Sequence, residues 1–582
     1  MKNELIGALK TAASAAGVEA SLIGAITLDF PDNTEHGDFT TNVAMVNAKK
    51  LAMNPRALAE KIVSEFEKVK PTIIKEVSIA GPGFINFKIK DEVFAKEVLA
   101  VSSEASKKVA KSAKNNSANI LIEHTDPNTF KPFHIGHLMA NAIGESLSRL
   151  VKHSGADVTR ICYPSDIGLH IAKSIWAIRK CENESPKSIP TDKASVIDRT
   201  AFLGKMYAEG TAAYDADPQA KKEIDALNVA IYEKSDKAAN AWYEKGRKWS
   251  LEHFELLYKR LGTQFDEYIY ESEVAPIGKS IVEKFLAKGV FEKSEGAVVF
   301  PGEKHGLHTR VFISSIGLPT YEAKDIGLNI TKFEKHPKTE KSIIITASEQ
   351  NDYFKVLIKA LTCIDENVGT KTKHIGHGML RFASGKMSSR TGKVITAETL
   401  IDDIKALVVQ KIADRKFSPA EADEVADMVA IGAIKYTILR QAIGGDVIFD
   451  STASISFEGD SGPYLQYAAV RAGAILQKAI EEGIEIAGDN AGIKLPAKVG
   501  ELEKLLTRFP VIAERACTEY APQNIANYLI NLASTFNSFY ASQIIVNKKD
   551  PLSPYYVAVT KAFRQTMVDG LDLLGIKVPK RM

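Results

Sequence analysis

Cysteine is scarce in this sequence. The chain contains 4 cysteines, and no two of them form a CxxC pair (Cys162, Cys181, Cys363, Cys517). Structural zinc sites and disulfide frameworks are built from closely spaced cysteines, so the spacing argues against both. We therefore expect no structural metal site, reduced thiols and a cytoplasmic location.

Long apolar runs are also missing. No uninterrupted apolar stretch approaches the ~18 residues that span a bilayer, and we expect no membrane partner. The first residues, MKNELIGALKTAASAAGVEA, predict a small amphipathic helix, because charges break the apolar stretch that a signal peptide requires. The net charge is only +3, so a nucleic-acid-binding surface would have to be local.

The length of 582 residues predicts several domains. Helical patterns followed by a strand-like segment, Val77–Lys90, open the chain, and a polar, lysine-rich stretch comes next. Strand and helix patterns then alternate, interrupted by a charged helical insertion, until helical periodicity takes over. The expected divisions are residues 1–102, a linker at 103–119, a middle domain at 120–395 with the insertion at about 182–260, and a helical domain at 396–582.

Two βαβ units organise the predicted middle domain. In the first, the strand ILIEH from Ile120 leads into the loop TDPNTFKPFHIGH, a helix and the strand ADVTRICY. The second begins at SIIITASEQ, Ser342 to Gln350. Open α/β sheets bind ligands beyond the carboxyl ends of their strands, so the loop after the first strand is the predicted ligand site.

The string HIGH occurs twice, at His134–His137 and at His374–His377. The first copy stands between a strand and a helix, where unsatisfied backbone N–H groups attract anions. Gly136 would let a nucleotide approach the backbone, and the two histidines would donate to phosphate oxygens. An isolated four-residue match is more often only a helix-capping loop. The second copy precedes a strand-like segment, and we interpret it as a coincidence on a supporting strand.

A basic, serine-containing loop follows the second βαβ unit. Lys386-Met387-Ser388-Ser389-Arg390 lies between Gly385 and Gly392 and suits a clamp over a polyphosphate. Alone, such a segment is usually just a loop. In combination with the first HIGH copy it is much less expected by chance.

Taken in order, these signatures resemble the HIGH and KMSKS motifs of class I aminoacyl-tRNA synthetases. The similarity is closest to the arginyl-tRNA synthetases and covers nearly the whole chain. The segments that carry it are HGDFTTNVAM, NPRALAEKI, AGPGFINF, EHTDPNTFKPFHIGH, TYEAKDIG, SEQNDYF, GKMSSRTGK, FEGDSGPYLQYA and GLDLLGIKVPKRM. The resemblance implies an α/β fold with a Rossmann-like catalytic core, an α+β N-terminal domain and an all-α C-terminal anticodon-binding domain.

The implied activity is ligation of L-arginine to tRNA(Arg) through arginyl-adenylate, with ATP as substrate and release of AMP and pyrophosphate. An arginine side chain is a planar cationic fork that carboxylates recognise best. By resemblance, the guanidinium would be held by Glu123, Tyr321 and Asp325, and Tyr321 and Asp325 are four apart on an expected helix. A lone carboxylate is more often a solvated surface group.

The resemblance also assigns the other substrates. The α-amino group of arginine would be held by Asp126, Asn128 and Gln350. The ATP phosphates, with an accompanying Mg²⁺, would be contacted by His134, Gly136, His137, Lys386, Met387 and Ser388. Catalytic roles fall to His134, His137 and Lys386, and the enzyme is expected to act as a monomer.

Four positions depart from the family pattern. Ser389 stands where the KMSKS signature has its second lysine, and Lys131, three residues before His134, would compensate for it. Its alternative role is an ordinary loop lysine. Asp126 replaces a common serine, and two further departures are His170 for glutamine and Met139 for arginine.

Both ends of the chain are expected to bind tRNA. The N-terminal domain would bind the tRNA elbow, and aromatic residues of the helical domain would stack on anticodon bases, unless they are simply core residues. The candidates are Tyr464, Tyr467, Tyr540 and the terminal Met582.

Two rival classes remain open at this point. A different class I synthetase, for glutamate, cysteine or lysine, is disfavoured by the absent zinc-type cysteines and by the acidic pair Glu123 and Asp325. A noncatalytic RNA-binding paralogue would have no need to keep His134, His137 and Lys386.

Overall fold

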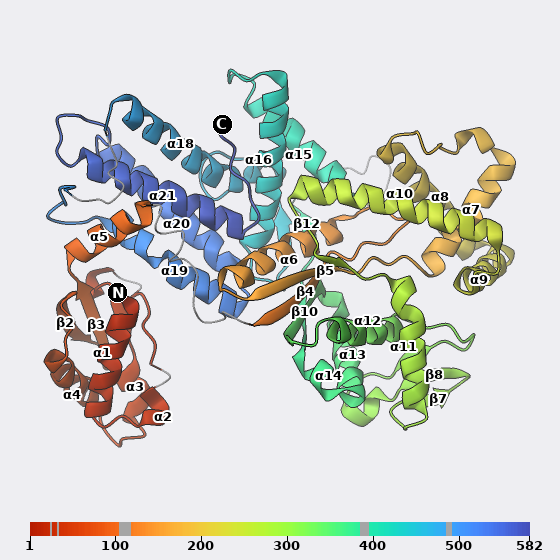
Figure 1. Cartoon of the computed structure of the whole chain (residues 1–582), viewed down its shortest axis with the longest axis horizontal. Coiled ribbons are helices and arrows are strands. Elements are labelled where there is room, and N and C mark those ends of the chain that lie inside the picture. Colours follow the sequence, from red (N-terminus) through yellow and green to blue (C-terminus); the bar gives the residue numbers. More distant parts are fainter. Residues whose placement is uncertain (24–25, 32–33, 104–117, 384–394, 485–491) are drawn as a thin grey trace. The chain divides into compact units, whose positions relative to one another are not determined.

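The computed structural model describes residues 1–23, 26–31, 34–103, 118–383, 395–484 and 492–582 (Figure 1). These residues form two compact units. The first combines Met1–Val109, Arg471–Phe509 and Leu532–Thr566, and the second combines Ala110–Val470, Pro510–Asn531 and Met567–Met582. None of the helices in the described ranges is both long and apolar enough to span a bilayer, and the four cysteines are free thiols.

The N-terminal part of the first unit contains a three-stranded antiparallel sheet in the order β1-β3-β2. Its elements are α1 (Lys2–Ala15), α2 (Ala20–Ile23), β1 (Phe39–Thr41), α3 (Val43–Ala48), α4 (Pro55–Lys68), β2 (Ile74–Ala80), β3 (Phe84–Ile89) and α5 (Asp91–Ser102). The strand-like segment Val77–Lys90 comprises the end of β2 and the whole of β3. Gly81 and Gly83 have positive φ values of 53° and 137°, which turn the chain between β2 and β3 into a hairpin.

A buried acidic residue links this sheet to the helical part of the same unit. Asp38 accepts a hydrogen bond from the Ile89 backbone N–H at 2.8 Å and pairs with Lys504 of α19 (Glu501–Glu519) at 2.8 Å. Asp91, at the start of α5, accepts from the Val499 N–H at 3.1 Å. Segments 408 and 466 residues apart in the sequence therefore fold together, which no local sequence pattern predicts.

The second unit is built on a parallel five-stranded sheet in the order β11-β10-β4-β5-β6. Its strands are β4 (Asn119–His124), β5 (Asp157–Cys162), β6 (Glu267–Tyr268), β10 (Thr339–Ala347) and β11 (Thr372–His377). The chain runs outward from β4 to β6 and then returns to β10 on the other side of β4. The carboxyl ends of β4 and β10 are therefore the switch point where such sheets bind ligands, as the sequence predicted for the loop after β4.

Helices cover this sheet and carry the insertion. They are α6 (Ile135–His153), α7 (Leu169–Glu184), α8 (Val196–Ala216), α9 (Pro218–Glu233), α10 (Lys237–Leu261), α11 (Glu271–Leu286), α12 (Tyr321–Lys335), α13 (Asn351–Ile364) and α14 (Glu366–Lys371). A small antiparallel sheet, β7 (Glu292–Ser294), β8 (Ala297–Phe300) and β9 (Arg310–Ile313), separates α11 from α12. Helices α7 to α10 pack around one apolar core and are called the insertion below; α8 to α10 lie in the predicted range of about 182–260, and α7 mostly precedes it.

Helices dominate after residue 395: α15 (Ala397–Lys411), α16 (Pro419–Leu439), α17 (Ser451–Ser454), α18 (Gly462–Glu481), α19, α20 (Gln523–Ser542) and α21 (Ser553–Leu573). One short strand, β13 (Val447–Phe449), breaks the helical pattern and pairs in parallel with β12 (Leu380–Phe382). The α/β core, α+β N-terminal region and helical C-terminal region are thus as expected.

Glycine allows α11 and α12 to cross closely. A Cβ at Gly327 of α12 would lie 2.3 Å from the Val274 carbonyl oxygen, and one at Gly278 of α11 would lie 1.8 Å from that of Ala323. Both obstacles are backbone, which cannot move aside easily. Gly327 therefore allows the close packing of α12, the helix that carries Asp325, against α11.

We predict that Gly327→Ala lowers the free energy of unfolding by about 1–3 kcal/mol, the usual cost of forcing extra volume into a packed interface. Chemical denaturation monitored by circular dichroism measures the change. Gly445→Ala is the matched control, because its Cβ would meet only the Ala442 carbonyl oxygen, at 3.5 Å. Equal stability of the two variants would contradict the assigned role of Gly327.

Candidate active site

The loop between β4 and α6 adopts an unusual backbone. Thr125, Asp126 and Phe130 have positive φ values of 83°, 42° and 62°. Non-glycine residues rarely occupy this region, and a β-branched residue does so only under constraint. Such strain persists at functional sites when surrounding contacts hold it in place.

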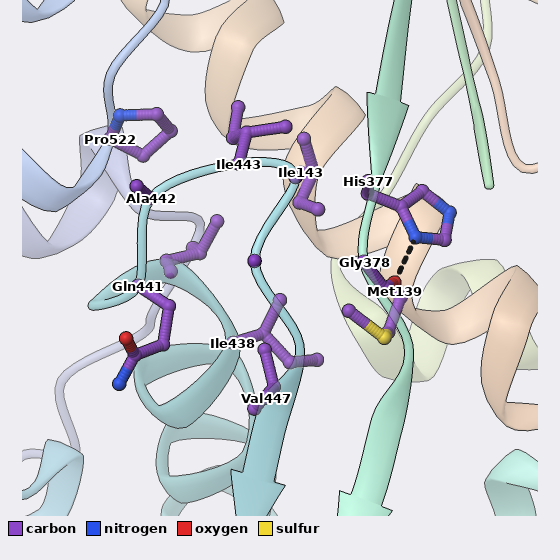
Figure 2. Close-up of a pocket in the computed structure, with 13 residues that line it drawn as sticks. Met139, Ile143, His377, Gly378, Ile438, Gln441, Ala442, Ile443, Val447 and Pro522 are labelled. Carbon is purple, nitrogen blue, oxygen red and sulfur yellow. Dashed lines mark hydrogen bonds between the residues drawn. The ribbon is translucent and has the colours of Figure 1, made fainter. Parts of the chain in front are cut away.

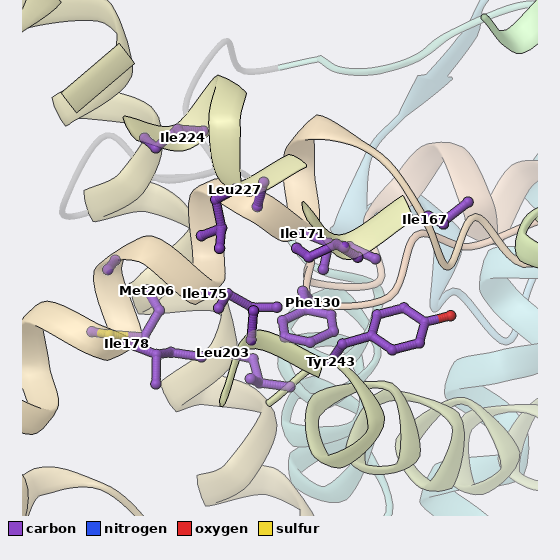
Figure 3. Packing of buried hydrophobic residues seen from close by; sticks show 14 of the residues in the cluster. Phe130, Ile167, Ile171, Ile175, Ile178, Leu203, Met206, Ile224, Leu227 and Tyr243 are labelled. Carbon is purple, nitrogen blue, oxygen red and sulfur yellow. The ribbon is translucent and has the colours of Figure 1, made fainter. Parts of the chain in front are cut away.

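Those contacts come from two directions. Beyond β5, the Ser165 carbonyl accepts from the Thr129 N–H at 3.0 Å, and the Ser165 N–H donates to the Pro127 carbonyl at 3.0 Å. From the insertion, the Ser250 hydroxyl accepts from the Phe130 N–H at 2.9 Å. The Phe130 ring is fully buried among residues of the insertion, including Ile171, Ile175 and Tyr243 (Figure 3).

The first HIGH copy caps α6. His134 Nδ1 accepts from the Gly136 N–H at 3.1 Å, and His137 Nδ1 accepts from the His134 N–H at 3.3 Å. The two imidazoles stack with centroids 3.6 Å apart. A Cβ at Gly136 would lie 3.0 Å from two atoms of the His134 ring, so a larger residue would press against the ring where it folds over the helix start.

Both histidines are held neutral. Burial lowers the pKa of His134 and lowers the pKa of His137 well below its usual value, and the charge of Lys131 acts in the same direction on both. Because each Nδ1 accepts a backbone hydrogen bond, the single ring proton of each residue belongs on Nε2. Each Nε2–H is then available to donate to a ligand.

The second HIGH copy lies within β11, as predicted, and not at a helix start. The His374 ring stacks on Phe354 with centroids 4.0 Å apart, and His377 Nδ1 hydrogen-bonds to the neighbouring Gly378 carbonyl at 2.7 Å (Figure 2). Met139, where the family has arginine, is buried in the largely apolar pocket beside His377. The methionine thus packs against apolar side chains, which a solvated arginine would not suit.

The basic loop lies outside the described residues. This applies to Lys386, Met387, Ser388 and Ser389. The residues that follow this segment return to the first HIGH copy: Thr396 pairs with His134 in an isolated β-bridge, and the Ala397 N–H donates to the Phe133 carbonyl at 2.9 Å.

Three carboxylates meet at the carboxyl end of β4. Glu123, only 4% exposed, forms an ion pair with the fully buried Lys332 of α12. Asp126 accepts from the Tyr163 N–H at 2.7 Å, and Asp325 accepts from the Tyr353 hydroxyl at 2.5 Å. Glu123 acts electrostatically on both aspartates, so the acidic residues that the sequence placed far apart do converge.

The pKa values of the two aspartates reflect this crowding. Burial raises the pKa of Asp325 to about 8, and Glu123 adds to the effect while the Tyr353 hydroxyl opposes it. Burial also raises the pKa of Asp126 well above its usual value, followed by the effect of Glu123. Perturbed carboxylates of this kind mark candidate functional sites.

The other predicted arginine-site residues surround this cluster less tightly. Tyr321 begins α12 and is 55% exposed, with the Lys324 ammonium 4.9 Å from the centre of its ring. Asn128 is half-buried and forms an isolated β-bridge with Ser165. Gln350 is exposed, just beyond the carboxyl end of β10.

Sequence reasoning missed two tyrosines of this site. Tyr353 bonds directly to Asp325, and its position three residues after Gln350 was a usable signal. Tyr163 follows β5, and its buried hydroxyl has no hydrogen-bond partner among the described residues. Burial raises the pKa of Tyr163 well above its usual value, with Glu271 and Asp325 contributing, so it is a neutral donor beside the carboxylates.

Lys131 is half-buried beside the HIGH loop. Its ammonium lies 4.8 Å from the ring centre of Tyr207 on α8, and its charge acts on both HIGH histidines.

The four candidate tRNA residues belong to different units. Tyr464 and Tyr467 are half-buried on α18 in the second unit, which also contains Met582, whereas Tyr540 is in the first, under the Arg471 guanidinium at 4.3 Å.

Comparison with protein families identifies the class. Residues 98–451 match the model for tRNA synthetases class I (R), catalytic domain, residues 465–582 match the DALR anticodon binding domain, and residues 3–89 match the arginyl tRNA synthetase N terminal domain. The parallel sheet with a HIGH helix start at its switch point is thus the catalytic core of a class I aminoacyl-tRNA synthetase.

Similarity to individual relatives identifies the family within this class. Arginine–tRNA ligase of Borrelia hermsii is 30% identical over 566 residues, 96% of this chain and 94% of that relative. That of Parabacteroides distasonis is 31% identical over 481 residues, 80% of each chain. Arginyl-tRNA synthetase of Thermus thermophilus has the same fold, with a TM-score of 0.80 over both whole chains at 21% identity. The chain belongs to the arginyl-tRNA synthetase family and has arginine–tRNA ligase activity.

The cap geometry predicts the protonation of the HIGH histidines. In ¹⁵N-histidine spectra at about pH 6, below the usual histidine pKa, His134 and His137 should both give neutral signals with the proton on Nε2. His134→Gln and His137→Gln assign the two resonances. An imidazolium signal, or a proton on Nδ1, would show that the cap does not set the ring state.

Proposed function

We propose that the buried acidic cluster is the arginine site. Glu123, Tyr321 and Asp325 hold the guanidinium, and Asp126, Asn128 and Gln350 hold the α-amino group. The observation that supports this is the charge balance. Lys332 forms an ion pair with Glu123 and acts electrostatically on the two aspartates. When Asp126 and Asp325 ionise against the substrate, two negative charges are left to be matched, and arginine brings a guanidinium and an α-ammonium.

The same site discriminates against lysine. A lysine ammonium is a compact point charge, whereas the guanidinium fork offers paired donors to two carboxylates at once. A bound lysine would leave one buried acceptor without a partner, which costs far more than a lost contact at a surface.

The two histidines and the basic loop serve ATP in this proposal. His134 and His137 donate from Nε2 to the phosphates as charge builds up during attack by the arginine carboxylate, and Gly136 gives the nucleotide access to the helix start. Lys386, with Met387 and Ser388, covers the departing pyrophosphate. The pairing of Thr396 with His134 supports this, because it ties the end of that segment to the HIGH loop.

Mg²⁺ enters this scheme as part of the substrate, bound through ATP phosphate oxygens. In the described residues, no group of three His, Cys, Asp or Glu side chains could hold a metal by itself. The reaction then proceeds by in-line displacement to arginyl-adenylate, followed by transfer to a terminal ribose hydroxyl of tRNA(Arg), without a covalent enzyme intermediate.

The tRNA contacts in the proposal are the elbow for residues 1–102 and the anticodon for the helical C-terminal residues. Tyr464, Tyr467 and Tyr540 offer ring faces for stacking, and Met582 lies at the chain end. The proposed working form is a cytoplasmic monomer, which light scattering tests against the chain mass of 63.5 kDa.

Arginine affinity should depend on pH in a defined direction. Below about pH 8, Asp325 carries a proton that the incoming cation must displace, so affinity should rise with pH and level off above the raised pKa of about 8. Titration calorimetry in buffers of different ionisation enthalpy should detect the released proton.

The variant that tests the same point is Asp325→Asn, which imitates the protonated carboxyl. It should weaken arginine binding about thirtyfold or more above pH 8, flatten the pH dependence and leave ATP affinity nearly unchanged. Asp352→Asn, on an exposed carboxylate of α13, is the control. Equal loss of arginine and ATP binding would indicate misfolding, and unchanged arginine binding would refute the site.

Lys131 should act on the rate of adenylation. If its ammonium replaces the missing second lysine of the KMSKS signature, Lys131→Ala should slow single-turnover adenylate formation about a hundredfold, the scale of a lost transition-state contact, with a much smaller change in arginine affinity. Rapid-quench kinetics with tRNA(Arg) present measure the step. Lys173→Ala, which also removes a lysine stacked on a tyrosine of the insertion, is the control. An unchanged rate of adenylate formation in Lys131→Ala would contradict this role of Lys131.

A further inference from the structure

His170 is a buried histidine that the proposed mechanism does not use. It is the second residue of α7 and is 6% exposed. Within the part of the chain that the structure describes, its Nε2 has no hydrogen-bond partner. Most buried polar atoms are hydrogen-bonded, and one that is not calls for an explanation such as a functional role, a water or a ligand.

The ring lies near α12 and within electrostatic range of the HIGH loop. A Cβ built on Gly168 would be 3.7 Å from His170 Nδ1 and 3.6 Å from Lys324 Nζ, so the imidazole and that ammonium flank the same glycine. Lys324 directly precedes Asp325 on α12. On the other side, the charge of Lys131, in the HIGH loop, also acts on the ring.

The free nitrogen is an acceptor. Burial, followed by the charges of Lys131 and Lys324, lowers the pKa of His170 well below its usual value, so the ring is neutral. The Ser165 backbone hydrogen-bonds to the ring and favours its protonated form, which identifies the carbonyl oxygen as the partner. The ring proton therefore belongs on Nδ1, toward that carbonyl, and Nε2 carries a lone pair.

The chemistry of this position selects the ligand group. A cationic donor, such as the guanidinium or ammonium of arginine, is repelled by Lys131 and Lys324 and is attracted to the carboxylates. An anion would require the ring to gain a proton, which burial opposes. A neutral donor fits. The neutral donors shared by ATP and the tRNA end are the ribose hydroxyls and the adenine amino group, and only the hydroxyls are removed in the deoxy analogues used below.

We propose that His170 Nε2 accepts a hydrogen bond from a ribose hydroxyl of a nucleotide substrate. The proposal deepens the function given above and rests on it, since it requires ATP and the tRNA end to lie between the HIGH loop and α12. The ribose belongs either to ATP or to the terminal nucleotide of tRNA(Arg), and the two sources predict different kinetic changes.

The test compares His170→Phe, which removes the acceptor and keeps a flat ring, with His170→Gln, whose amide oxygen restores an acceptor. His305→Phe, at an exposed histidine stacked on Phe300, is the matched control. Arginine-dependent pyrophosphate exchange is measured with tRNA(Arg) present, using ATP, 2′-deoxyATP and 3′-deoxyATP. Transfer of arginine to tRNA is measured separately in a single turnover.

If the ribose is that of ATP, His170→Phe raises the KM for ATP roughly tenfold, the effect of a lost buried hydrogen bond, and has no effect with the deoxy analogue that lacks the bonded hydroxyl. If it is that of tRNA, exchange is unchanged and transfer slows roughly tenfold. In both cases His170→Gln recovers most of the loss.

The proposal is overturned if His170→Phe leaves both steps at wild-type rates, or if it slows reactions of ATP and both deoxy analogues equally. Absence of arginine-dependent exchange in the unmodified enzyme would instead refute the function on which the proposal rests.

Thermal stability separates binding from a structural role. The Ser165 carbonyl also accepts from the Thr129 N–H at 3.0 Å and the Thr129 hydroxyl at 3.2 Å, so it keeps partners in His170→Phe. Removing an unpaired buried acceptor should leave the Tm unchanged or raise it. A Tm that falls together with activity would identify His170 as a structural residue and overturn the proposal.

Discussion

The backbone between β4 and α6 is the constraint on which the site depends. Over ten residues the chain must carry Asp126 toward β5, place Asn128 beside Ser165 and bring His134 to the start of α6. It does so through left-handed positions at Thr125, Asp126 and Phe130, which are costly for non-glycine residues. The insertion offsets that cost, because Phe130 is buried in its apolar core and bonded to Ser250 (Figure 3). The insertion is thus part of the active-site scaffold whatever RNA contacts it makes.

Burial disfavours the charged forms of the titratable residues in the free site. Burial raises the pKa values of Asp126 and Asp325 and lowers those of the HIGH histidines and His170. Little like-charge repulsion therefore arises between the two aspartates before the substrates bind. When a guanidinium enters, Asp126 and Asp325 can ionise against it, whereas Glu123 keeps Lys332 as its partner, and the energy of the new pairing is available for recognition.

The sequence predicted the parts of this arrangement that follow from local order. A strand, a loop with HIGH and a helix had to place the motif at the carboxyl end of β4, and the second copy, followed by strand residues, had to lie on a strand. The family pattern selected Glu123 and Asp325, which the structure places within electrostatic range of each other. Long-range contacts were beyond reach: Tyr353 meets Asp325 only because β10 returns beside β4, and Asp38 meets Lys504 across most of the chain.

Two local details could not be predicted for the same reason. Gly81 and Gly83 divide the strand-like segment Val77–Lys90 between two strands of a hairpin, and the short strand β13 occurs among helices because β12 supplies a partner. The apolar periodicity of a segment predicts which of its faces is buried, but it does not predict which other strand pairs with that segment. The same limit applies to His170. Its position in the sequence, at the start of an amphipathic helix, is that of an ordinary buried residue. Only the three-dimensional structure shows that Lys131, Lys324 and Ser165 act on its ring and that its Nε2 has no partner among the described residues.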